Sequence, residues 1–431
     1  MRWALLIALL LPACGSEAPP FPQEVGFVSV DPEPAAPATG HMFYVLSSAD
    51  SDPGKKPVFV FFNGGPGVPT STNLLVDATG PEQFIVDAGQ GTVVKNAASF
   101  TRLGSLLYID ERETGFSYDD APAYSCTFDM QQDAIDFTRA ILRVLDTHPQ
   151  LTASRIVLVG ESYGGVRAQL ILQDLLHYTQ VPEITTEVQQ HLDTVFAAEA
   201  VHPPDEIARQ FFAQVLIQPV VVGAYQKLRP RPPSGICPND TRLTYSDCAN
   251  QYALVLGALA DPVQSTKLLG ARLEDVAGLA GPARHGARCA GTLDDPSNAF
   301  NTALLQRLGP LDPGDTYFGF NGMTGSWETD TTLEPPAFVD NLSYVRTLIT
   351  NATYDGIVDT TQIPPALVAF GVPATLDQTP RSGIARPGWI DVTLPGGGSA
   401  TIRLPTYPAG HMVTATDAAE LRTDTAAWLG L

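Results

Sequence analysis

The strongest constraint on the fold is the segment IVLVGESYGG at residues 156–165, in which an apolar run leads directly into a serine between glycines. The apolar run, bounded by turn-forming residues, predicts a buried strand, and the apolar spacing that follows from Val166 predicts one side of a helix. Gly160 and Gly164 allow the backbone to bend sharply and allow the strand and helix to approach each other. The sequence therefore predicts a nucleophile elbow with Ser162 exposed at its tip.

A reactive serine requires a histidine base and an orienting acid. In α/β-hydrolases both follow the serine along the chain, the acid first. Two histidines lie far downstream. His411 follows the strand-like segment TIRLPTY, whereas His285 lies in a polar stretch with no strand before it. His411 is therefore the better candidate for the base.

The candidate acids follow the segment TLITNA at residues 347–352, which predicts a buried strand. Asp355 and Asp359 both lie beyond its carboxyl end, where side chains reach the site of an open α/β sheet. Asp359 is favoured, because Asp355 stands next to Gly356 and is typical of a turn. Donors for the oxyanion are expected from the loop NGGPG at residues 63–67, whose glycines expose backbone N–H groups.

Five segments, in order, resemble the serine carboxypeptidase family, the α/β-hydrolases that remove C-terminal residues from peptides. They are residues 40–67, residues 106–120 ending near GFSY, the motif GESYGG, the motif YDGIVD, and residues 409–429 beginning AGHM. The resemblance implies an α/β-hydrolase fold, with a mostly parallel central sheet, helices on both faces and an inserted, mainly helical cap. It implies no cofactor and peptides as substrates.

The resemblance also implies a role for each matching residue. Ser162 would be the nucleophile, His411 the general base and Asp359 the orienting acid; Gly65 and Tyr163 would supply the oxyanion N–H groups; Asn63, Gly64 and Glu161 would bind the C-terminal carboxylate of the substrate. The Glu161 carboxyl group and the C-terminal carboxylate of the substrate would lie a hydrogen bond apart, so they cannot both remain ionised. Glu161 would therefore hold a proton, and activity would favour acidic pH.

This chain departs from the family pattern around the oxyanion loop. Val68, Pro69 and Thr70 replace a Cys-Ser-Ser sequence, so the disulfide usual after the loop is missing. Ala78 stands where the family has an acid that contributes to carboxylate recognition, with Asp77 one position earlier.

The segment DERETGFS at residues 110–117 also aligns with proline iminopeptidase-like hydrolases, which cleave from the N-terminus. An aminopeptidase or esterase of that kind is therefore one alternative function. A catalytically inactive binding protein of the same fold is the other.

The expected organisation has five parts: a signal peptide at residues 1–14, a Pro-rich tether at 15–39, the first part of the hydrolase core at 40–181, a cap at 182–340, and the second part of the core at 341–431. Residues 205–228 and 265–281 carry helical periodicity and are assigned to the cap. The cap would shape the pocket and exclude water.

The N-terminal segment MRWALLIALLLPACGS predicts export, because Arg2 precedes an apolar run too short to span a membrane stably. The sequence LPAC resembles the bacterial lipobox, which implies lipid on Cys14 and possible membrane attachment; ordinary cleavage near Ala13 is the alternative. The expected location is the cell envelope, in the periplasm or at the outer membrane, or the exterior as a secreted protein.

Charge and cysteine content limit the remaining partners. The formal net charge of -21 disfavours nucleic acid and anionic lipid as partners. Cys126, Cys237, Cys248 and Cys289 allow two disulfides in three connectivities, of which Cys237 with Cys248 closes a short loop. The histidines and cysteines show no spacing typical of a metal site, and the oligomeric state stays open.

Overall fold

The computed structural model describes most of the chain outside the region of the expected cap. The described residues are 23–32, 40–64, 66–67, 69–71, 77–87, 90–112, 114–119, 127–221, 291–293, 318–321, 324–325, 335–353, 355, 358–381, 386–409 and 411–431. Residues 1–22, most of 222–334 and all five cysteines lie outside them. The predictions of a signal peptide, a lipidated Cys14, disulfides and a helical cap therefore concern residues that are not described.

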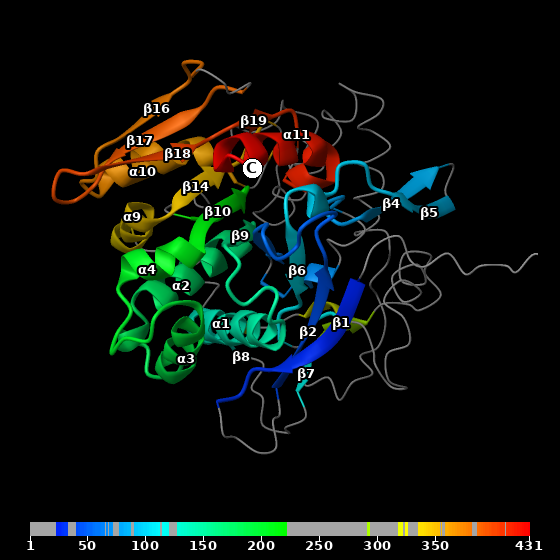
Figure 1. Cartoon of the computed structure of the whole chain (residues 1–431). Helices are drawn as coiled ribbons and strands as arrows, with labels where there is room; N and C mark the ends of the chain where they lie inside the picture. The colour runs from blue at the N-terminus through cyan, green and yellow to red at the C-terminus, as the bar shows by residue number, and fades with distance from the viewer. Residues whose placement is uncertain are drawn as a thin grey trace, which may run out of the picture.

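An 11-stranded sheet forms the centre of the molecule, in the order β1-β2-β6-β3-β9-β10-β14-β18-β17-β16 with β7 beside β2 (Figure 1). The parallel strands are β6 (Ser105–Ile109), β3 (Val58–Phe62), β9 (Ile156–Glu161), β10 (Phe211–Ile217), β14 (Arg346–Ile349) and β18 (Ser399–Arg403). The antiparallel strands are β1 (Gln23–Ser29), β2 (Gly40–Ser47) and β7 (Tyr118–Asp119) at one side, and β17 (Trp389–Thr393) and β16 (Ala374–Asp377) at the other.

Helices cover both faces of this sheet (Figure 1). They are α1 (Met130–Thr147), α2 (Gly164–Leu176), α3 (Thr185–Val195), α4 (Pro204–Gln210), α9 (Pro335–Tyr344), α10 (Ile363–Ala369) and α11 (Val413–Leu429), with 3-10 turns η2 (Phe100–Arg102), η3 (Tyr178–Gln180) and η5 (Thr360–Gln362). Four two-stranded sheets pair β4 (Glu82–Asp87) with β5 (Gln90–Lys95), β15 (Asn351–Ala352) with β19 (Thr406–Tyr407), β8 (Thr127–Phe128) with β13 (Thr324–Gly325), and β11 (Gly291–Leu293) with β12 (Phe318–Asn321).

Two hydrophobic clusters, one on each side of the sheet, hold these layers together. Alternate residues of β3 belong to different clusters: Val58, Val60 and Phe62 pack with α1 and α2, whereas Phe59 and Phe61 pack on the side of α11. A strand buried on both faces is expected to be apolar throughout, as these parallel strands are. The expected α/β architecture, with a mostly parallel sheet between helices, is confirmed.

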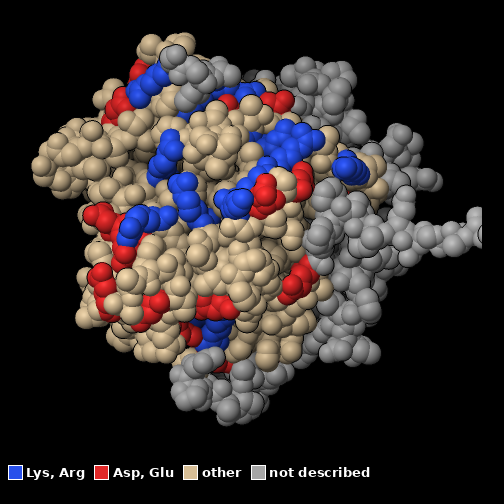
Figure 2. Space-filling model, viewed as in Figure 1, with Lys and Arg blue, Asp and Glu red and all other residues tan. Residues whose placement is uncertain are grey.

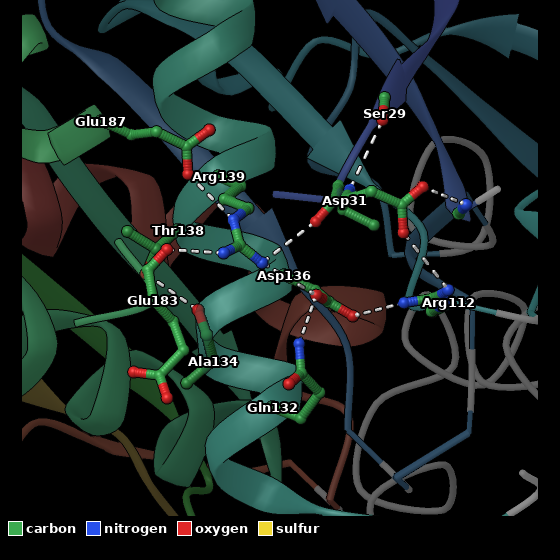
Figure 3. Close-up of polar contacts among 12 residues, drawn as sticks. Ser29, Asp31, Arg112, Gln132, Ala134, Asp136, Thr138, Arg139, Glu183 and Glu187 are labelled. Atoms are coloured by element: carbon green, nitrogen blue, oxygen red, sulfur yellow. Dashed lines mark hydrogen bonds and ion pairs between the residues drawn. The ribbon is translucent and has the colours of Figure 1, made fainter. Parts of the chain in front are cut away.

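The expectation of a Pro-rich tether at residues 15–39 was wrong for β1, which pairs with β2 along its whole length. Arginines of α1 fasten the end of this strand: Arg139 donates to the carbonyl oxygen of Val30 at 3.2 Å, and Arg143 donates to that of Ser29 at 2.6 Å. Figure 3 shows Arg139 between Glu187 and this strand, with Asp31 facing Arg112. The high proline content of this segment favoured an irregular tether over a strand. The short run EVGFVS is nevertheless apolar enough to pair at the sheet edge.

The expected helix at residues 205–228 and the expected start of the cap at 182 were also wrong. Helix α4 ends at Gln210, and β10 follows at once in the middle of the sheet, between β9 and β14. Every residue of β10 is buried. A continuous apolar run of this length fits a buried parallel strand or a buried helix equally well, and its position between two parallel strands decided the outcome. The core thus extends to Val221 and resumes at α9.

Within the described residues, no helix is long and apolar enough to cross a membrane.

Candidate active site

Ser162 lies in a strained turn between β9 and α2. Its φ angle is +55°, a left-handed conformation that side-chain-bearing residues rarely adopt. Two backbone hydrogen bonds to the end of β10 hold the turn: the Ser162 N–H donates to the Ile217 carbonyl at 2.9 Å, and the Val220 N–H donates to the Ser162 carbonyl at 3.0 Å. This is the geometry of a nucleophile elbow.

Glycines around the elbow let three backbone segments approach closely. A Cβ atom on Gly160 would lie 2.1 Å from the Gly164 carbonyl oxygen, and one on Gly64 would lie 2.7 Å from the Ser162 Cβ and 2.8 Å from the Tyr163 nitrogen. Gly64 therefore brings the loop after β3 against the serine and the first turn of α2. That proximity is what an oxyanion site built from both segments requires.

His411 contacts Asp355, the aspartate that the sequence interpretation set aside in favour of Asp359. The His411 Nδ1 lies 2.7 Å from the Asp355 Oδ2, and Asp355 is fully buried. Asp359 instead caps the turn η5, where its Oδ1 accepts from the N–H of Thr361 at 3.1 Å. Of the two aspartates, Asp355 lies nearer to the carboxyl end of a strand, because it follows β15 by only three residues.

Gln218, which the sequence interpretation did not single out, fixes Asp355 from the end of β10. Its Nε2 donates to the Asp355 Oδ2 at 2.6 Å, and its Oε1 accepts from the Ala352 N–H at 2.8 Å. The Val358 N–H donates to the other Asp355 oxygen at 3.1 Å. Asp355 thus accepts from three donors, which favours its ionised form. The sequence signal for Gln218 was its position, because a polar residue directly after the apolar strand β10 lies at the edge of the sheet that carries the site.

A second buried acid, Asp77, lies near Glu161. Glu161 is 4% exposed, and its Oε2 accepts from the Thr414 hydroxyl at 3.1 Å. Burial, and then the negative charge of Glu161, raise the pKa of Asp77 well above its usual range. Neither Asp77 oxygen has a hydrogen-bond partner within the described part of the chain. The two carboxyl groups therefore form a buried pair directly behind the nucleophile.

Ala78 accounts for how Asp77 reaches this position although it stands one residue earlier than the family pattern requires. Its φ angle is +46°, a left-handed conformation that turns the backbone locally. The buried acid near Glu161 is therefore Asp77, one position before the residue at which the family pattern has its acid.

A fully buried arginine braces the oxyanion loop. Arg167 of α2 donates from Nη1 to the Asn63 carbonyl at 2.7 Å and from Nε to Asp133 at 2.7 Å. Its Nη2 donates at 2.5 Å to Glu111 Oε2, which also accepts from the Gly67 N–H at 3.0 Å. Arg167 and Glu111 therefore hold the two ends of the NGGPG loop from beneath.

Asp110 anchors the same loop further along. Its carboxylate accepts from the Ser71 N–H at 2.7 Å, the Ser71 hydroxyl at 3.0 Å and the Phe116 N–H at 3.1 Å. Burial raises the pKa of Asp110 to about 7, although these hydrogen bonds oppose the shift. The family pattern has a disulfide after this loop. This chain instead has the buried carboxyl groups of Glu111 and Asp110, which bind the backbone at Gly67 and Ser71.

The structure brings together most of the predicted site residues. Tyr163 stands at the N-terminus of α2 beside Gly64, and Asn63 is 5% exposed at the end of β3. Gly65 lies outside the described residues. No group of three or more potential metal ligands occurs in the described ranges.

A family model for serine carboxypeptidases matches residues 12–192, which contain β1 to η3, most of α3 and the nucleophile elbow. Residues 12–192 therefore resemble serine carboxypeptidases. The similar curated proteins agree over the same part. Serine carboxypeptidase-like 16 of Arabidopsis thaliana is 30% identical over 166 residues, which are 37% of each chain. Serine carboxypeptidase-like 28 of the same plant is 30% identical over 147 residues, 34% of this chain and 30% of the relative.

The aligned part of the chain thus spans 37% and 30% of the lengths of these two relatives. Among solved structures, the prohormone-processing carboxypeptidase Kex1Δp from Saccharomyces cerevisiae has a TM-score of 0.57 at 15% identity, covering 95% of this chain and 91% of its own. At that identity the likeness establishes the fold, which is the α/β-hydrolase fold.

Proposed function

We propose that this protein is a serine carboxypeptidase that hydrolyses the C-terminal peptide bond of peptides through an acyl-enzyme. Ser162 attacks the carbonyl carbon while His411 accepts the hydroxyl proton, and His411 then donates it to the leaving amine. Asp355 accepts a hydrogen bond from the Nδ1–H group of His411, which leaves Nε2 as the base. The N–H groups of Gly65 and Tyr163 receive the oxyanion. Water then hydrolyses the acyl-enzyme by the same steps.

The buried carboxyl pair, Asp77 and Glu161, is the observation that carries this proposal. A simple ester carries no group that requires two buried carboxyl groups, and a site for an N-terminal ammonium requires ionised carboxylates, whereas burial and the Glu161 charge keep Asp77 protonated more readily than usual. A carboxypeptidase has a use for such a pair, because a protonated carboxyl donates a hydrogen bond to the carboxylate of the substrate. Asn63 and Gly64 border the same space and complete the proposed binding site.

The same pair supports the proposed preference for acidic pH. The raised pKa of Asp77 keeps a proton on the pair in acid. As the pH rises through that pKa, the pair gains a second negative charge, which repels the incoming carboxylate. We therefore expect KM to rise with pH.

The decisive experiment compares two blocked dipeptides from acidic to neutral pH. One has a free C-terminal carboxylate and a blocked amine, and the other has the reverse. We expect wild-type protein to cleave only the first, most strongly in acid, and Ser162→Ala to cleave neither. Asp77→Asn should retain cleavage and flatten the rise of KM with pH, because an amide cannot acquire the second charge.

Cleavage of the second dipeptide alone would reassign the protein to the iminopeptidase-like branch. Cleavage of neither, with serine-dependent hydrolysis of simple esters, would indicate an esterase. Binding of the first peptide without turnover would indicate an inactive binding protein.

We also propose that the chain is exported and carries lipid on Cys14, with peptides as its substrates in the cell envelope. The sequence LPAC after an apolar run supports this. The mass of the mature N-terminal peptide checks it, since acylation adds the lipid to Cys14, whereas ordinary cleavage near Ala13 leaves a free thiol.

A further inference from the structure

Cations gather at the amino ends of the parallel strands, opposite the candidate active site. Five neighbouring strands are each preceded by, or begin with, a basic residue: Arg102 lies before β6, Lys56 before β3, Arg155 before β9, Arg209 before β10, and Arg346 opens β14. We call these five residues the basic edge. Four are exposed, and Lys56 is half-buried.

The register of the sheet places these residues side by side. Val58 pairs with both Ser105 and Ile156, and Ile156 pairs with Phe211, so the strand starts are level. The pKa values of nearby arginines are consistent with this proximity. Burial and the Arg155 charge lower the pKa of Arg346, and burial and the Arg102 charge lower the pKa of Arg422. Figure 2 shows Lys and Arg in a band across the middle of the molecule.

The basic edge is only weakly neutralised by the protein itself. Within the described residues, Arg209 forms an ion pair with Glu206, whereas Lys56, Arg102, Arg155 and Arg346 have no acidic partner within 4.0 Å. Lys56 donates to the Arg102 carbonyl, and Arg155 lies over the Phe212 ring at 3.5 Å. Asp50 and Glu420 are the acids whose charges act on Arg422. In a chain of net charge -21, adjacent unneutralised cations mark a surface suited to an anionic partner.

The candidate active site lies at the other ends of the same strands. Ser162, Gln218 and Asp355 follow β9, β10 and β15, at the carboxyl ends of the parallel strands. A strand of the length of β9 extends about 20 Å. A partner bound at the basic edge therefore leaves the substrate entrance uncovered.

The N-terminal segment joins the fold at the basic edge. Gln23, the first residue of β1, pairs with Ser47, and Ser47 pairs with Leu106 near the start of β6. Residues 15–22 separate Cys14 from β1 in the sequence. A segment of that length reaches at most about 28 Å when fully extended.

We propose that the basic edge lies against the anionic headgroups of a lipid surface, with the active site directed away from it. The choice of a lipid surface rests on the proposed lipidation of Cys14. The short connection from Cys14 favours a membrane over a soluble polyanion, because a lipid there would hold the basic edge against the bilayer. The overall negative charge does not prevent contact, since charges beyond a Debye length of about 8 Å are largely screened. The near face therefore dominates the interaction.

The test is sedimentation of the full chain with vesicles of phosphatidylcholine, with and without phosphatidylglycerol. Cys14→Ser is used throughout, so that acylation does not contribute and every variant has the same N-terminus. We expect binding to the anionic vesicles only, weakened by salt. Each lost cation should reduce the partition coefficient about fivefold. Arg155→Gln should therefore bind about fivefold less, and Lys56→Gln/Arg102→Gln/Arg155→Gln at least tenfold less.

Arg381→Gln is the matched control, because it removes one half-buried arginine elsewhere, where Arg381 pairs with Asp377 and Asp391. It should bind like the parent protein. Hydrolysis by all variants should be unchanged, which establishes that they are folded. Equal binding by the triple variant and the parent, equal binding to neutral vesicles, or binding to polyglutamate in preference to vesicles would each overturn the proposal.

Discussion

Asp355 receives hydrogen bonds from a side-chain amide, a backbone N–H and an imidazole, so its environment is arranged for a carboxylate. An amide in its place could accept from His411 and Gln218 only by turning its own N–H₂ toward the Val358 N–H, which is also a donor. The site therefore specifies a charge at this position.

At the residue scale, Asp355→Asn should lower kcat by roughly three to four orders of magnitude, because the imidazole loses the acceptor that fixes its tautomer. Steady-state kinetics on the peptide with a free C-terminus measures the loss. Asp359→Asn is the control, which should change kcat less than threefold and reduce stability by about 1 kcal/mol or less, since it alters only a cap. A larger kinetic effect from Asp359→Asn would restore that residue to the triad.

Sequence order was sufficient to predict the elbow around Ser162 and to select His411, because both follow short, recognisable strands. It was not sufficient to choose between two aspartates four residues apart. That choice depended on where β15 ends and on Gln218, a residue from a different strand. Asp77 was obscured for a related reason, since a single left-handed residue, Ala78, displaces the pattern by one position.

At the element scale, α2 is joined to the oxyanion loop by one buried arginine and two buried acids. Arg167 and Asp133 belong to α2 and α1, and Glu111 follows β6. Burial raises the pKa of Glu111 to about 7, while the Arg167 guanidinium opposes the shift. Because the loop is attached to three elements, its position depends on their packing rather than on a covalent link.

We predict that Arg167→Lys lowers kcat ten- to a hundredfold, because one ammonium cannot reach Asn63, Glu111 and Asp133 together and the oxyanion donors shift. Arg139→Lys removes an equally buried arginine from its contacts with Glu187 and Val30, on the far side of α1. The control should lose thermal stability without losing kcat. If both variants lose stability and neither loses kcat, Arg167 has only a structural role.

The elements that sequence patterns missed were those whose identity depends on their neighbours. β1 is short and lies at the sheet edge among prolines, so pairing with β2 and the arginines of α1 define it. β10 is apolar throughout, and only its place between β9 and β14 distinguishes it from a helix. By contrast, β3, β6 and β9 were predictable because turn-forming residues bound each apolar run.

At the scale of the whole molecule, several buried acids change how stability depends on pH. Burial is the main cause that raises the pKa of each, to about 7 for Asp110 and Glu111 and to about 6 for Asp136 and Asp174. In an unfolded chain these carboxyl groups titrate near pH 4. Between those values the folded protein binds more protons than the unfolded chain, so the free energy of unfolding falls as the pH rises.

We therefore predict that the urea midpoint is higher at about pH 5 than at about pH 7.5. Asp110→Asn should show a smaller difference, because the amide resembles the protonated acid at every pH. Below about pH 4 the trend should reverse, since a hydrogen bond from His148 lowers the pKa of Glu24 and protonation removes that contact. A midpoint that rises from pH 5 to pH 7.5 would contradict the prediction.

The place at which the core is interrupted has a consequence for how such proteins can diversify. The chain leaves the described core after Val221 and returns at α9, yet the strands on either side, β10 and β14, are adjacent and paired. Their hydrogen bonds fix the two ends of the interruption independently of what lies between them. Because the entropic cost of a loop grows only slowly with its length, segments of very different size can be exchanged here. The size of the inserted segment can therefore change while Ser162, Asp355 and their supports keep their positions.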